Sequence, residues 1–418
     1  MNEVLRVITP RELPRTRREP VDAATLAAVA PIVEDVRREG LLAIERHAVR
    51  FGELAHSQTV LLDPAALKAS ASSIAAEDLD LLRRTAASVA LFAGAQRAAL
   101  THQLSVPVTG GTAGHSVAPV AAAGCYAPGG RYPLPSSVLM TACVARAAGV
   151  ARVVVASPKP SPVTLAAAHV AGADAFLCVG GAHAIAALAY GFEGFEPVDL
   201  VCGPGNKYVT AAKKLVMGTV GIDMLAGPSE LVVLADDSAD ARIVAADLLA
   251  QAEHDDDATP ILVTTSRALA HAVNVELARQ LTSLTTAVTA RKACENGVIV
   301  VAASMDEAIG VVDRLAPEHL EVMTTDARSV SARCTNYGGI FIGKGSAEVF
   351  GDYGVGPNHT LPTGGSARFA AGLSVFTFLR ARTFLDLEPT SALIADTACL
   401  ARLEGLEAHA RAAESRKA

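Results

Sequence analysis

The feature that most constrains this chain is a repeated pattern between residues 117 and 235. Short apolar runs such as ARVVVASP, DAFLCVGG and PVDLVCGPG each end at Gly or Pro, and Ala-rich helical stretches lie between them. Strands that alternate with short helices are typical of βαβ units and a parallel sheet. Open parallel sheets bind ligands beyond the strand ends, which here fall at Pro158, Gly180 and Gly203.

A second series of strand-like runs follows, ELVVLADD, ILVTTS, GVIVVAAS and GGIFIG, with the helical segments DARIVAADLLAQAEH and ALAHAVNVELARQL between them. A chain of 418 residues is longer than one ordinary domain. We therefore expect an α/β protein with two facing Rossmann-like lobes, each built on a parallel sheet. The second lobe, on the cofactor side, is predicted at 123–230. The first is predicted to be discontinuous, at 21–122 and 231–373.

The two ends of the chain differ from these lobes. Residues 1–20 lack periodicity and are predicted to form an N-terminal arm. Residues 22–50 and 78–100 have apolar side chains at helical spacing and are predicted to be helices. Residues 374–418 follow a Pro/Gly-rich stretch and are polar on one face, which predicts a helical C-terminal extension outside both lobes.

Composition excludes several classes of protein. The net charge is −7 with both signs interspersed, whereas nucleic-acid binding requires a basic stripe. Apolar runs are broken by Gly or Pro before they reach membrane-spanning length, and no signal peptide is visible. The seven cysteines are dispersed without a CxxC pair, which indicates reduced thiols and argues against a Cys-rich zinc site. We expect a soluble, cytoplasmic protein.

Two pairs of residues could carry chemistry. Gln251 and His254 lie three positions apart on a helix, so they share one face, and His is the commonest metal ligand. A polar helix end on the surface would have the same pattern. Glu318 and His319 follow Pro317, which predicts a turn. A carboxylate beside an imidazole can act as an acid/base pair, although adjacent Glu-His pairs also arise by chance.

Two later segments also hold candidate residues. GDYGVGPNHTLPTGG places Asp352, Asn358 and His359 in irregular backbone, which favours a site over a surface loop. Whether His359 acts directly or structurally stays open. Glu404 and His409 lie five positions apart, about 140° on an ideal helix, so they share no face unless Gly405 interrupts it. A solvated helix is the alternative.

Strand-to-turn segments supply further candidates. GPGNKYVTAAKKLV begins with a tight turn, and the helix after it could hold an anion or a polar cofactor atom at its N-terminus. It is not a GxGxxG fingerprint. GCYAPGGRYPLPSS offers the flat face of Tyr126, and GIDMLAGPSE places Ser229 at another strand end.

Together, CGPGNKYVTAAKKLV, GIDMLAGPSELVVLAD, LLAQAEHD, APEHLEV, GDYGVGPNHTLPT and EGLEAHARAA resemble the histidinol dehydrogenase family, in register over about residues 20–415. The resemblance implies one zinc ion per subunit. Its ligands would be Gln251, His254, Asp352 and His409. All-N/O ligation suits zinc and agrees with the dispersed cysteines.

The resemblance also implies roles for other residues. Glu318 and His319 would be the general acid/base pair. The substrate would contact Ser229 and Glu404 together with His319 and the four zinc ligands, and NAD would contact Tyr126, His183 and Asn206. Two NAD would oxidise L-histidinol through L-histidinal to L-histidine, the last steps of histidine biosynthesis. The family forms an intertwined homodimer whose C-terminal segment crosses to the partner, so His409 would complete the neighbouring site.

Three departures from the family pattern keep alternatives open. His183 stands where the family usually has Gln, and EGLLAIERHAVRFG differs from the sequence that the family usually has in this segment. GGRYPLPSS resembles the sulfopropanediol dehydrogenase branch, and its Arg131 leaves an anionic substrate such as a sulfonated diol open. Asp352 and Glu404 favour histidinol. A zinc hydrolase and a non-catalytic metal-binding paralogue are the rival classes, and retention of Glu318 and His319 argues against the paralogue.

Overall fold

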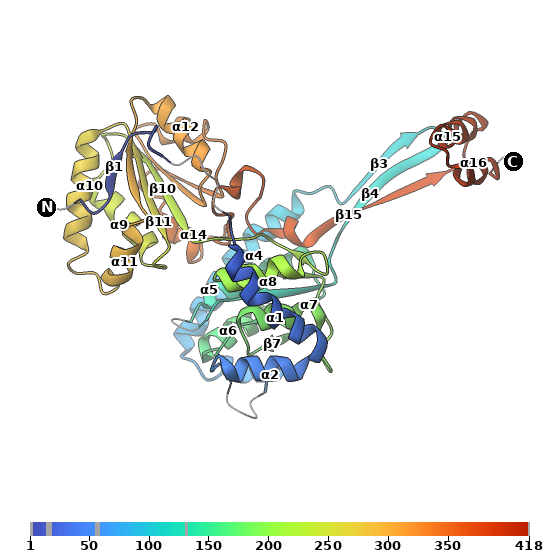
Figure 1. The fold of residues 1–418 in the computed structure, drawn as a ribbon, viewed down its shortest axis with the longest axis horizontal. Helices are drawn as coiled ribbons and strands as arrows, with labels where there is room; N and C mark the ends of the chain where they lie inside the picture. Colours follow the sequence, from blue (N-terminus) through green and yellow to red (C-terminus); the bar gives the residue numbers. More distant parts are fainter. Residues whose placement is uncertain (1–2, 14–18, 55–58, 130–132, 417–418) are drawn as a thin grey trace.

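The computed structural model describes residues 3–13, 19–54, 59–129 and 133–416. Two six-stranded sheets and one three-stranded sheet organise them. Figure 1 shows the two larger sheets in separate lobes and the smaller sheet extending away from both. We name the two lobes the β5 lobe and the β10 lobe after a central strand of each. The predicted α/β architecture with two parallel sheets is confirmed.

The β5 lobe contains the strands between residues 61 and 222, apart from two strands that belong to the three-stranded sheet. Its sheet has the order β2 (Leu61–Leu62), β7 (Ala175–Leu177), β6 (Arg152–Ala156), β5 (Ala122–Tyr126), β8 (Leu200–Cys202) and β9 (Gly221–Ile222). All neighbours are parallel except β2, which pairs antiparallel with β7. The helices that connect these strands are α5 (Pro135–Ala148), α6 (Pro162–Val170), α7 (Gly181–Tyr190) and α8 (Lys207–Val216).

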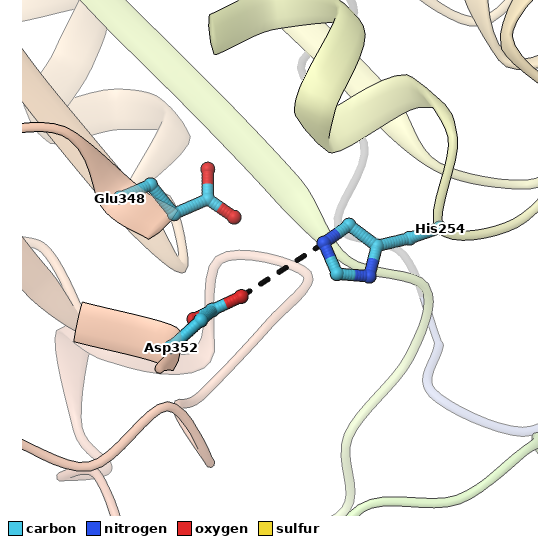
Figure 2. A group of neighbouring side chains, drawn as sticks. All are labelled: His254, Glu348 and Asp352. Atoms are coloured by element: carbon cyan, nitrogen blue, oxygen red, sulfur yellow. Dashed lines mark ion pairs between the residues drawn. The ribbon is translucent and has the colours of Figure 1, made fainter. Parts of the chain in front are cut away.

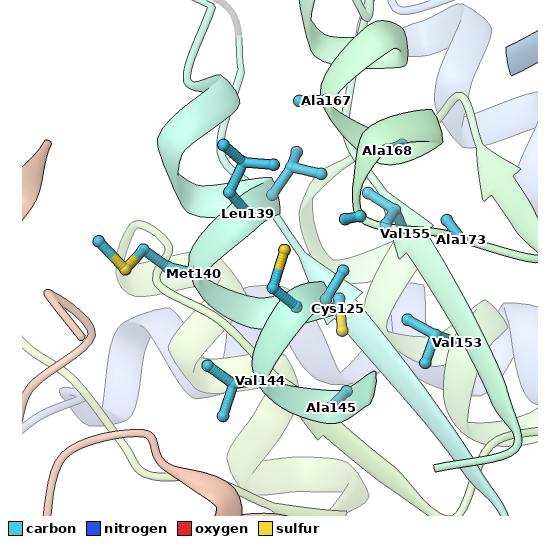
Figure 3. Close-up of a cluster of buried hydrophobic side chains, with 14 of the residues drawn as sticks. Cys125, Leu139, Met140, Val144, Ala145, Val153, Val155, Ala167, Ala168 and Ala173 are labelled. Atoms are coloured by element: carbon cyan, nitrogen blue, oxygen red, sulfur yellow. The ribbon is translucent and has the colours of Figure 1, made fainter. Parts of the chain in front are cut away.

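Small side chains let these helices lie close to the sheet. Figure 3 shows Cys125 of β5 and Val155 of β6 among Leu139, Ala167 and Ala168 of α5 and α6. Because alanine adds little width, helix backbones approach the strands closely and the core needs few aromatic rings. The Ala-rich composition therefore determines the packing of this lobe.

The helices that precede β5 in the chain also belong to this lobe. They are α1 (Ala23–Glu39), α2 (Leu41–Arg50), α3 (Pro64–Ala71) and α4 (Ala76–Ala98). Helix α1 packs on α7 and α8, α3 packs on α6, and α4 packs on α5. The structure thus groups residues 23–98 with the β5 sheet, whereas the division predicted from the sequence joins 21–122 to 231–373. Periodicity identified α1, α2 and α4 but not α3, and it carries no information on which sheet a helix covers.

The β10 lobe holds the second part of the chain. Its sheet is parallel throughout, in the order β1 (Arg6–Ile8), β12 (Val298–Val301), β11 (Thr259–Thr264), β10 (Glu230–Ala235), β13 (His319–Met323) and β14 (Gly339–Ile342). Its helices are α9 (Ala241–Ala252), α10 (Arg267–Gln280), α11 (Ala287–Cys294), α12 (Met305–Leu315), α13 (Ala327–Ser331) and α14 (Glu348–Asp352).

The N-terminal segment is not a free arm. Residues 6–8 form β1 at the edge of the β10 sheet, paired with β12. The side-chain oxygen of Asn274 accepts hydrogen bonds from the backbone N–H groups of Val4 and Leu5, at 3.1 and 2.8 Å. The predicted arm is therefore wrong for this segment, because a three-residue strand is too short to show a pattern.

The C-terminal segment is also more than a helical extension. Strand β15 (Leu379–Leu387) pairs antiparallel with β4 (Gly111–Pro119), which pairs in turn with β3 (Gln103–Val108). Short 3-10 turns at Ser366–Arg368 and Val375–Phe378 precede β15. Helices α15 (Ser391–Leu403) and α16 (Glu407–Glu414) follow it at the tip of this sheet (Figure 1). The predicted helical character is wrong for 379–387, whose pairing partner lies more than two hundred residues earlier.

Of the helices in the described ranges, none has both the length and the apolar character needed to cross a membrane.

Candidate active site

The predicted acid/base pair, Glu318 and His319, lies at the amino end of β13, beside the amino end of the neighbouring strand β10. Glu230 opens β10 and His319 opens β13, and Leu231 pairs with His319 in the parallel register. Pro317 does precede the pair in a loop, as the sequence predicts, but His319 already belongs to the strand. The strand holds the ring rigidly, which a turn would not do.

His319 is arranged to accept a proton. Its Nδ1 lies 3.3 Å from the backbone oxygen of Glu230, and a carbonyl can only accept, so the proton of the neutral ring is on Nδ1. The other nitrogen, Nε2, is buried and has no hydrogen-bond partner among the described residues. Burial lowers the pKa of His319 to about 3, so the ring is neutral near pH 7. An unpaired neutral nitrogen is suited to general-base catalysis.

Glu318 is the second member of the pair. Its Oε2 accepts a hydrogen bond from the backbone N–H of Glu230 at 3.0 Å, and the hydroxyl of Ser229 donates to the same carboxyl group. Burial raises the pKa of Glu318 well above its ordinary value. Its Oε2 lies 3.7 Å from Nδ1 of His319. Glu318 therefore lies in contact with Ser229 and close to His319.

Helix α9 delivers two of the predicted metal ligands. Gln251 lies in its last turn and is fully buried, yet neither atom of its amide group has a hydrogen-bond partner among the described residues. His254 follows the end of the helix, and its side chain is 42% exposed. A buried amide without a partner costs about 1–3 kcal/mol, so its persistence indicates a ligand that it serves.

Helix α14 carries the third predicted ligand. Asp352 Oδ2 lies 3.9 Å from Nε2 of His254 (Figure 2). Glu348, one turn earlier on α14, points into the same space, and the ligand atoms of His254, Glu348 and Asp352 all lie within 4.8 Å of one another. Burial raises the pKa of Asp352 to about 7 and that of Glu348 well above its ordinary value.

This donor set fits a divalent metal. It offers an imidazole nitrogen, carboxylate oxygens and an unpartnered amide, and nitrogen and oxygen donors suit zinc. Buried carboxyl groups without a cation nearby are costly as anions, and a bound dication removes that cost. The residues present therefore fit the zinc site implied by the sequence, with Glu348 as an addition.

The glycine-rich segment connects this site to the β5 lobe. Asn358 Nδ2 donates a 2.7 Å hydrogen bond to the backbone oxygen of Met140 in α5, and Thr363 Oγ1 accepts one from the N–H of Gly227 at 2.5 Å. His359 is half-buried, its Nε2 has no partner among the described residues, and burial lowers its pKa to about 4. The segment thus holds the two lobes together beside the site.

Glu404 and His409 do not join these residues within one chain. Glu404 caps α15 and His409 lies in α16, and both are exposed. Figure 1 places these helices at the tip of the projecting sheet, away from the β10 lobe. Gly405, at φ 78°, separates the two helices, as the sequence suggested it could.

The predicted cofactor residues lie at the carboxyl ends of strands in the β5 lobe. Tyr126 ends β5, and its hydroxyl oxygen accepts a 3.1 Å hydrogen bond from the N–H of Gly181, the first residue of α7. Asn206 caps α8 and accepts from the N–H groups of Tyr208 and Val209. The residue Arg131 lies outside the described residues.

The similarity to known proteins agrees with this geometry. The family model for histidinol dehydrogenase matches residues 15–417. The chain is 44% identical to a histidinol dehydrogenase of Geobacillus kaustophilus over 397 residues, 93% of each chain. It is 49% identical to that of Thermus thermophilus over 311 residues, 74% of this chain and 76% of the other. A crystal structure of histidinol dehydrogenase from Elizabethkingia anophelis superposes with a TM-score of 0.90 at 30% identity, covering 100% of this chain and 98% of that one.

The chain belongs to the histidinol dehydrogenase family. This membership confirms the resemblance drawn from the six motifs. It also identifies the chain as an oxidoreductase of histidine biosynthesis. The rival classes, a zinc hydrolase and a non-catalytic paralogue, are not supported.

One departure from the histidinol dehydrogenase pattern has a structural explanation. His183 is fully buried, and its Nε2 lies 3.0 Å from Oε2 of Glu53, which also accepts a 2.8 Å hydrogen bond from the N–H of Gly180. The imidazole of His183, near the start of α7, is therefore held by Glu53 inside the lobe. These hydrogen bonds do not test the predicted contact of His183 with the cofactor.

The sequence reasoning missed two residues of the site. Glu348 was not predicted, although it lies four positions before Asp352 and so shares its helical face. Glu230 contributes its backbone to both Glu318 and His319, and no side-chain pattern announces a backbone role.

Proposed function

We propose that the protein oxidises L-histidinol through L-histidinal to L-histidine, reducing two NAD in succession. The observation that carries this proposal is the unpartnered Nε2 of His319 beside Glu318 and a buried set of N/O ligands. The names of the relatives, histidinol dehydrogenases at 42–49% identity, support the same substrate.

The proposed metal is one zinc ion per subunit. Gln251, His254 and Asp352 would hold it, with His409 as a fourth ligand from the partner subunit. Glu348 lies close enough to contact the same ion. When bound, zinc would supply a Lewis acid that helps to orient the substrate.

In the first oxidation, Nε2 of His319 takes the proton of the substrate hydroxyl as hydride passes to the first NAD. The aldehyde forms, one NADH is released, and one proton leaves the site. The Nδ1–H bond to the Glu230 carbonyl keeps the correct nitrogen free for this step. Burial lowers the pKa of the ring, so it is unprotonated and ready to accept.

In the second oxidation, Glu318 takes a proton from water, whose oxygen adds to the aldehyde carbon. Hydride then passes from the hydrated aldehyde to the second NAD, which leaves a carboxylate, NADH and two protons. Burial raises the pKa of Glu318, and this makes its carboxylate a stronger base than an exposed one. Ser229 donates to Glu318 and would also face the substrate.

The remaining substrate and cofactor contacts come from the family resemblance. Glu404 would pair with the substrate ammonium group, and Tyr126, Asn206 and His183 would serve NAD at the edge of the β5 lobe. The structure supports Tyr126 and Asn206 through their positions at strand ends where α7 and α8 begin. For His183 the support is indirect, through the Glu53 bond that fixes the start of α7.

We further propose a homodimer in which the projecting sheet and helices α15 and α16 reach the partner. Every residue of β3 is exposed, including Leu104 and Val106, and Leu400 and Leu403 of α15 are 60% and 80% exposed. Among the described residues, the buried cluster between α15 and α16 consists of three alanines, Ala398, Ala401 and Ala410. Apolar surface on so thin a projection needs a covering partner. A crossing arm would also bring Glu404 and His409 to the neighbouring site.

The cytoplasm remains the proposed location. All seven cysteines are free thiols in the structure, and six of them are buried. Free thiols are typical of a reducing compartment.

A substrate panel tests the function. Purified protein with NAD and zinc should form two NADH per L-histidinol and should also accept L-histidinal. Sulfopropanediol should give no NADH. A preference for the sulfonated diol would overturn the histidinol assignment in favour of that branch of the superfamily.

Subunit mixing tests the shared site. His319→Asn and His409→Asn should each be inactive alone, because one removes the base and the other removes a ligand. Mixed dimers should recover part of the activity, since one of their two sites carries neither change. Mixtures that stay inactive after confirmed exchange of subunits would contradict the crossing arm.

A further inference from the structure

Two further carboxyl groups, those of Glu321 and Asp247, lie next to the elements that carry the proposed metal ligands. Glu321 is fully buried and follows His319 by two positions on β13, so both side chains leave the same face of the sheet. Its Oε1 accepts a 2.7 Å hydrogen bond from the backbone N–H of Glu348, the first residue of α14. Helix α14 spans only five residues and ends at Asp352. So short a helix has little stability of its own, and its position depends on such anchors.

The same carboxyl group also contacts α9. The side chain of Asp247 forms a hydrogen bond with Glu321, and Asp247 lies one turn before Gln251. Among the described residues, no N–H group and no alcohol hydroxyl donates a hydrogen bond to Oδ2 of Asp247 or to Oε2 of Glu321. Glu321 is buried and Asp247 is half-buried, and two carboxyl groups in contact share a proton. Burial accordingly raises the pKa of Glu321 to about 8 and that of Asp247 to about 6.

Glu321 therefore joins the three elements that carry the site. It belongs to β13, which carries His319, and it bonds α14, which carries Glu348 and Asp352. Through Asp247 it bonds α9, which carries Gln251 and leads to His254. The reaction steps proposed above use neither Glu321 nor Asp247. Burying two acids without a cation destabilises a fold, so their presence calls for a role beyond packing.

We propose that Glu321 is a positioning residue that, through Asp247 and the N–H of Glu348, holds α9 and α14 at the separation the metal requires. The inference rests on the proposed metal centre. Residues that orient metal ligands commonly change metal affinity about 10- to 100-fold when they are removed. Glu321 acts one step further out, by orienting the helices that present the ligands.

The test compares two neutral replacements. Glu321→Gln keeps both hydrogen bonds, because its amide oxygen can accept from Glu348 N–H and its amide N–H can donate to Asp247. Glu321→Leu has similar size but can form neither bond. Both remove the ionisable group, so a difference between them reports hydrogen bonding alone. Zinc affinity of the full-length protein is measured by competition with a chromophoric chelator.

We expect Glu321→Leu to bind zinc about 10- to 100-fold more weakly than the wild type, and Glu321→Gln to stay within about threefold. The matched control is Val322→Ala. Val322 is buried on the same strand but faces the opposite core, so its truncation loosens packing without touching these bonds. Wild-type zinc affinity in Glu321→Leu, or an equal loss in Val322→Ala, would overturn the proposal.

Two further variants keep the test decisive. If Glu321→Leu does not fold, Asp247→Ala and Asp247→Asn repeat the comparison from the half-buried α9 side, with loss expected only for alanine. Equal zinc affinity in those two variants would count against positioning. His254→Asn separates the two proposals. Full zinc in His254→Asn would refute the metal centre itself, whereas zinc lost there but kept in Glu321→Leu would refute only the role of Glu321.

Discussion

The two lobes contain six-stranded sheets, yet the residues proposed for function lie at opposite edges of the two sheets. In the β5 lobe, Tyr126 ends a strand and Asn206 caps a helix that follows one, so this edge presents helix N-termini. In the β10 lobe, His319 begins a strand, Gln251 lies at the end of α9, and Asp352 is the last residue of α14. That edge presents helix C-termini.

The electrostatics of helices explains this difference. A helix N-terminus carries partial positive charge and free N–H groups, which suit the phosphates of a dinucleotide. A C-terminus carries partial negative charge, which suits a cation. The edge that each lobe uses therefore follows the charge of the ligand proposed for it, and fold topology alone does not decide it.

The lobes also treat buried charge differently. In the β5 lobe, buried Lys213 is paired with Asp223 and donates a 3.0 Å hydrogen bond to the carbonyl of Gly203. Asp223 in turn accepts from the N–H of Gly203, so the ion pair clamps the turn before α8. In the β10 lobe, Glu348 and Asp352 are buried without a cation and their pKa values are raised. The charges of the β5 lobe pair with each other, whereas the carboxyl groups of the β10 lobe line the proposed metal site.

The largest expected effect concerns the chemistry of the β10 lobe. Glu318→Gln should slow the oxidation of L-histidinal about 10²- to 10⁴-fold, because the amide cannot take a proton from water. Its oxygen can still accept from Glu230 N–H, so bound zinc should not change. Single-turnover NADH formation from L-histidinal, with metal analysis of the same sample, measures both. An unchanged yield of L-histidine would remove Glu318 from the mechanism.

The next largest effect is expected on stability, at the buried Lys213–Asp223 ion pair of the β5 lobe. Lys213→Met leaves Asp223 buried without its cation and should lower the free energy of unfolding by about 3–5 kcal/mol. The neighbouring exposed Lys214→Met is the control and should change it by less than about 0.5 kcal/mol. Urea unfolding compares the two. Similar values would show that the lobe does not depend on this pair.

Removing a buried carboxyl group of the β10 lobe should raise the free energy of unfolding, the opposite of the effect expected for Lys213→Met. The folded pKa of Asp352 is about 7, above the ordinary 3.8. The folded state thus binds more protons than the unfolded state between these values, and its stability falls as pH rises through that window. In metal-free protein above about pH 7, Asp352→Asn should raise the free energy of unfolding by at most about 4 kcal/mol.

Below about pH 4 the gain from Asp352→Asn should vanish, because the carboxyl group is then protonated in both states. With zinc present the sign should reverse, since the variant loses a ligand. Chemical unfolding with chelator and with zinc at both pH values provides the measurement. Destabilisation of the metal-free variant at neutral pH would show that Asp352 is structural.

The smallest effect is expected at the cofactor edge. His183→Gln restores the usual family residue, and its amide can still donate to Glu53. The KM for NAD should change by less than about tenfold, the value of one hydrogen bond, with kcat unaffected. Steady-state kinetics with varied NAD decides. A larger change in KM would indicate that His183 touches the cofactor directly.

The sequence predicted the local elements well where hydrophobic periodicity was strong. Helices α1, α4, α9 and α10 and strands β6, β10 and β12 lie where the apolar patterns place them. Strand β13 was overlooked because Pro317 and the polar pair Glu318-His319 conceal its start. Strand β1 was overlooked because three residues are too few to show a pattern, and β15 because its partner lies more than two hundred residues earlier in the chain.

For the site, too, local sequence motifs were informative and contacts between distant elements were not predictable. Motif wording predicted Gln251, His254 and Asp352, and the structure brings the last two within 3.9 Å of each other. Spacing alone favoured a surface helix end for Gln251, and only the fold buries it. Glu348 and Glu321 were missed because each acts through neighbours from other elements.

By itself the sequence determined the family, the alternation of strands and helices, and the residue types available for acid/base and metal chemistry. These depend on local pattern and on motif order, which a linear chain displays. Only the tertiary structure decided which sheet residues 23–98 cover, which edge of each sheet is used, and which nitrogen of His319 is free. Those outcomes depend on long-range packing and on backbone groups such as the Glu230 carbonyl, whose positions no local pattern encodes.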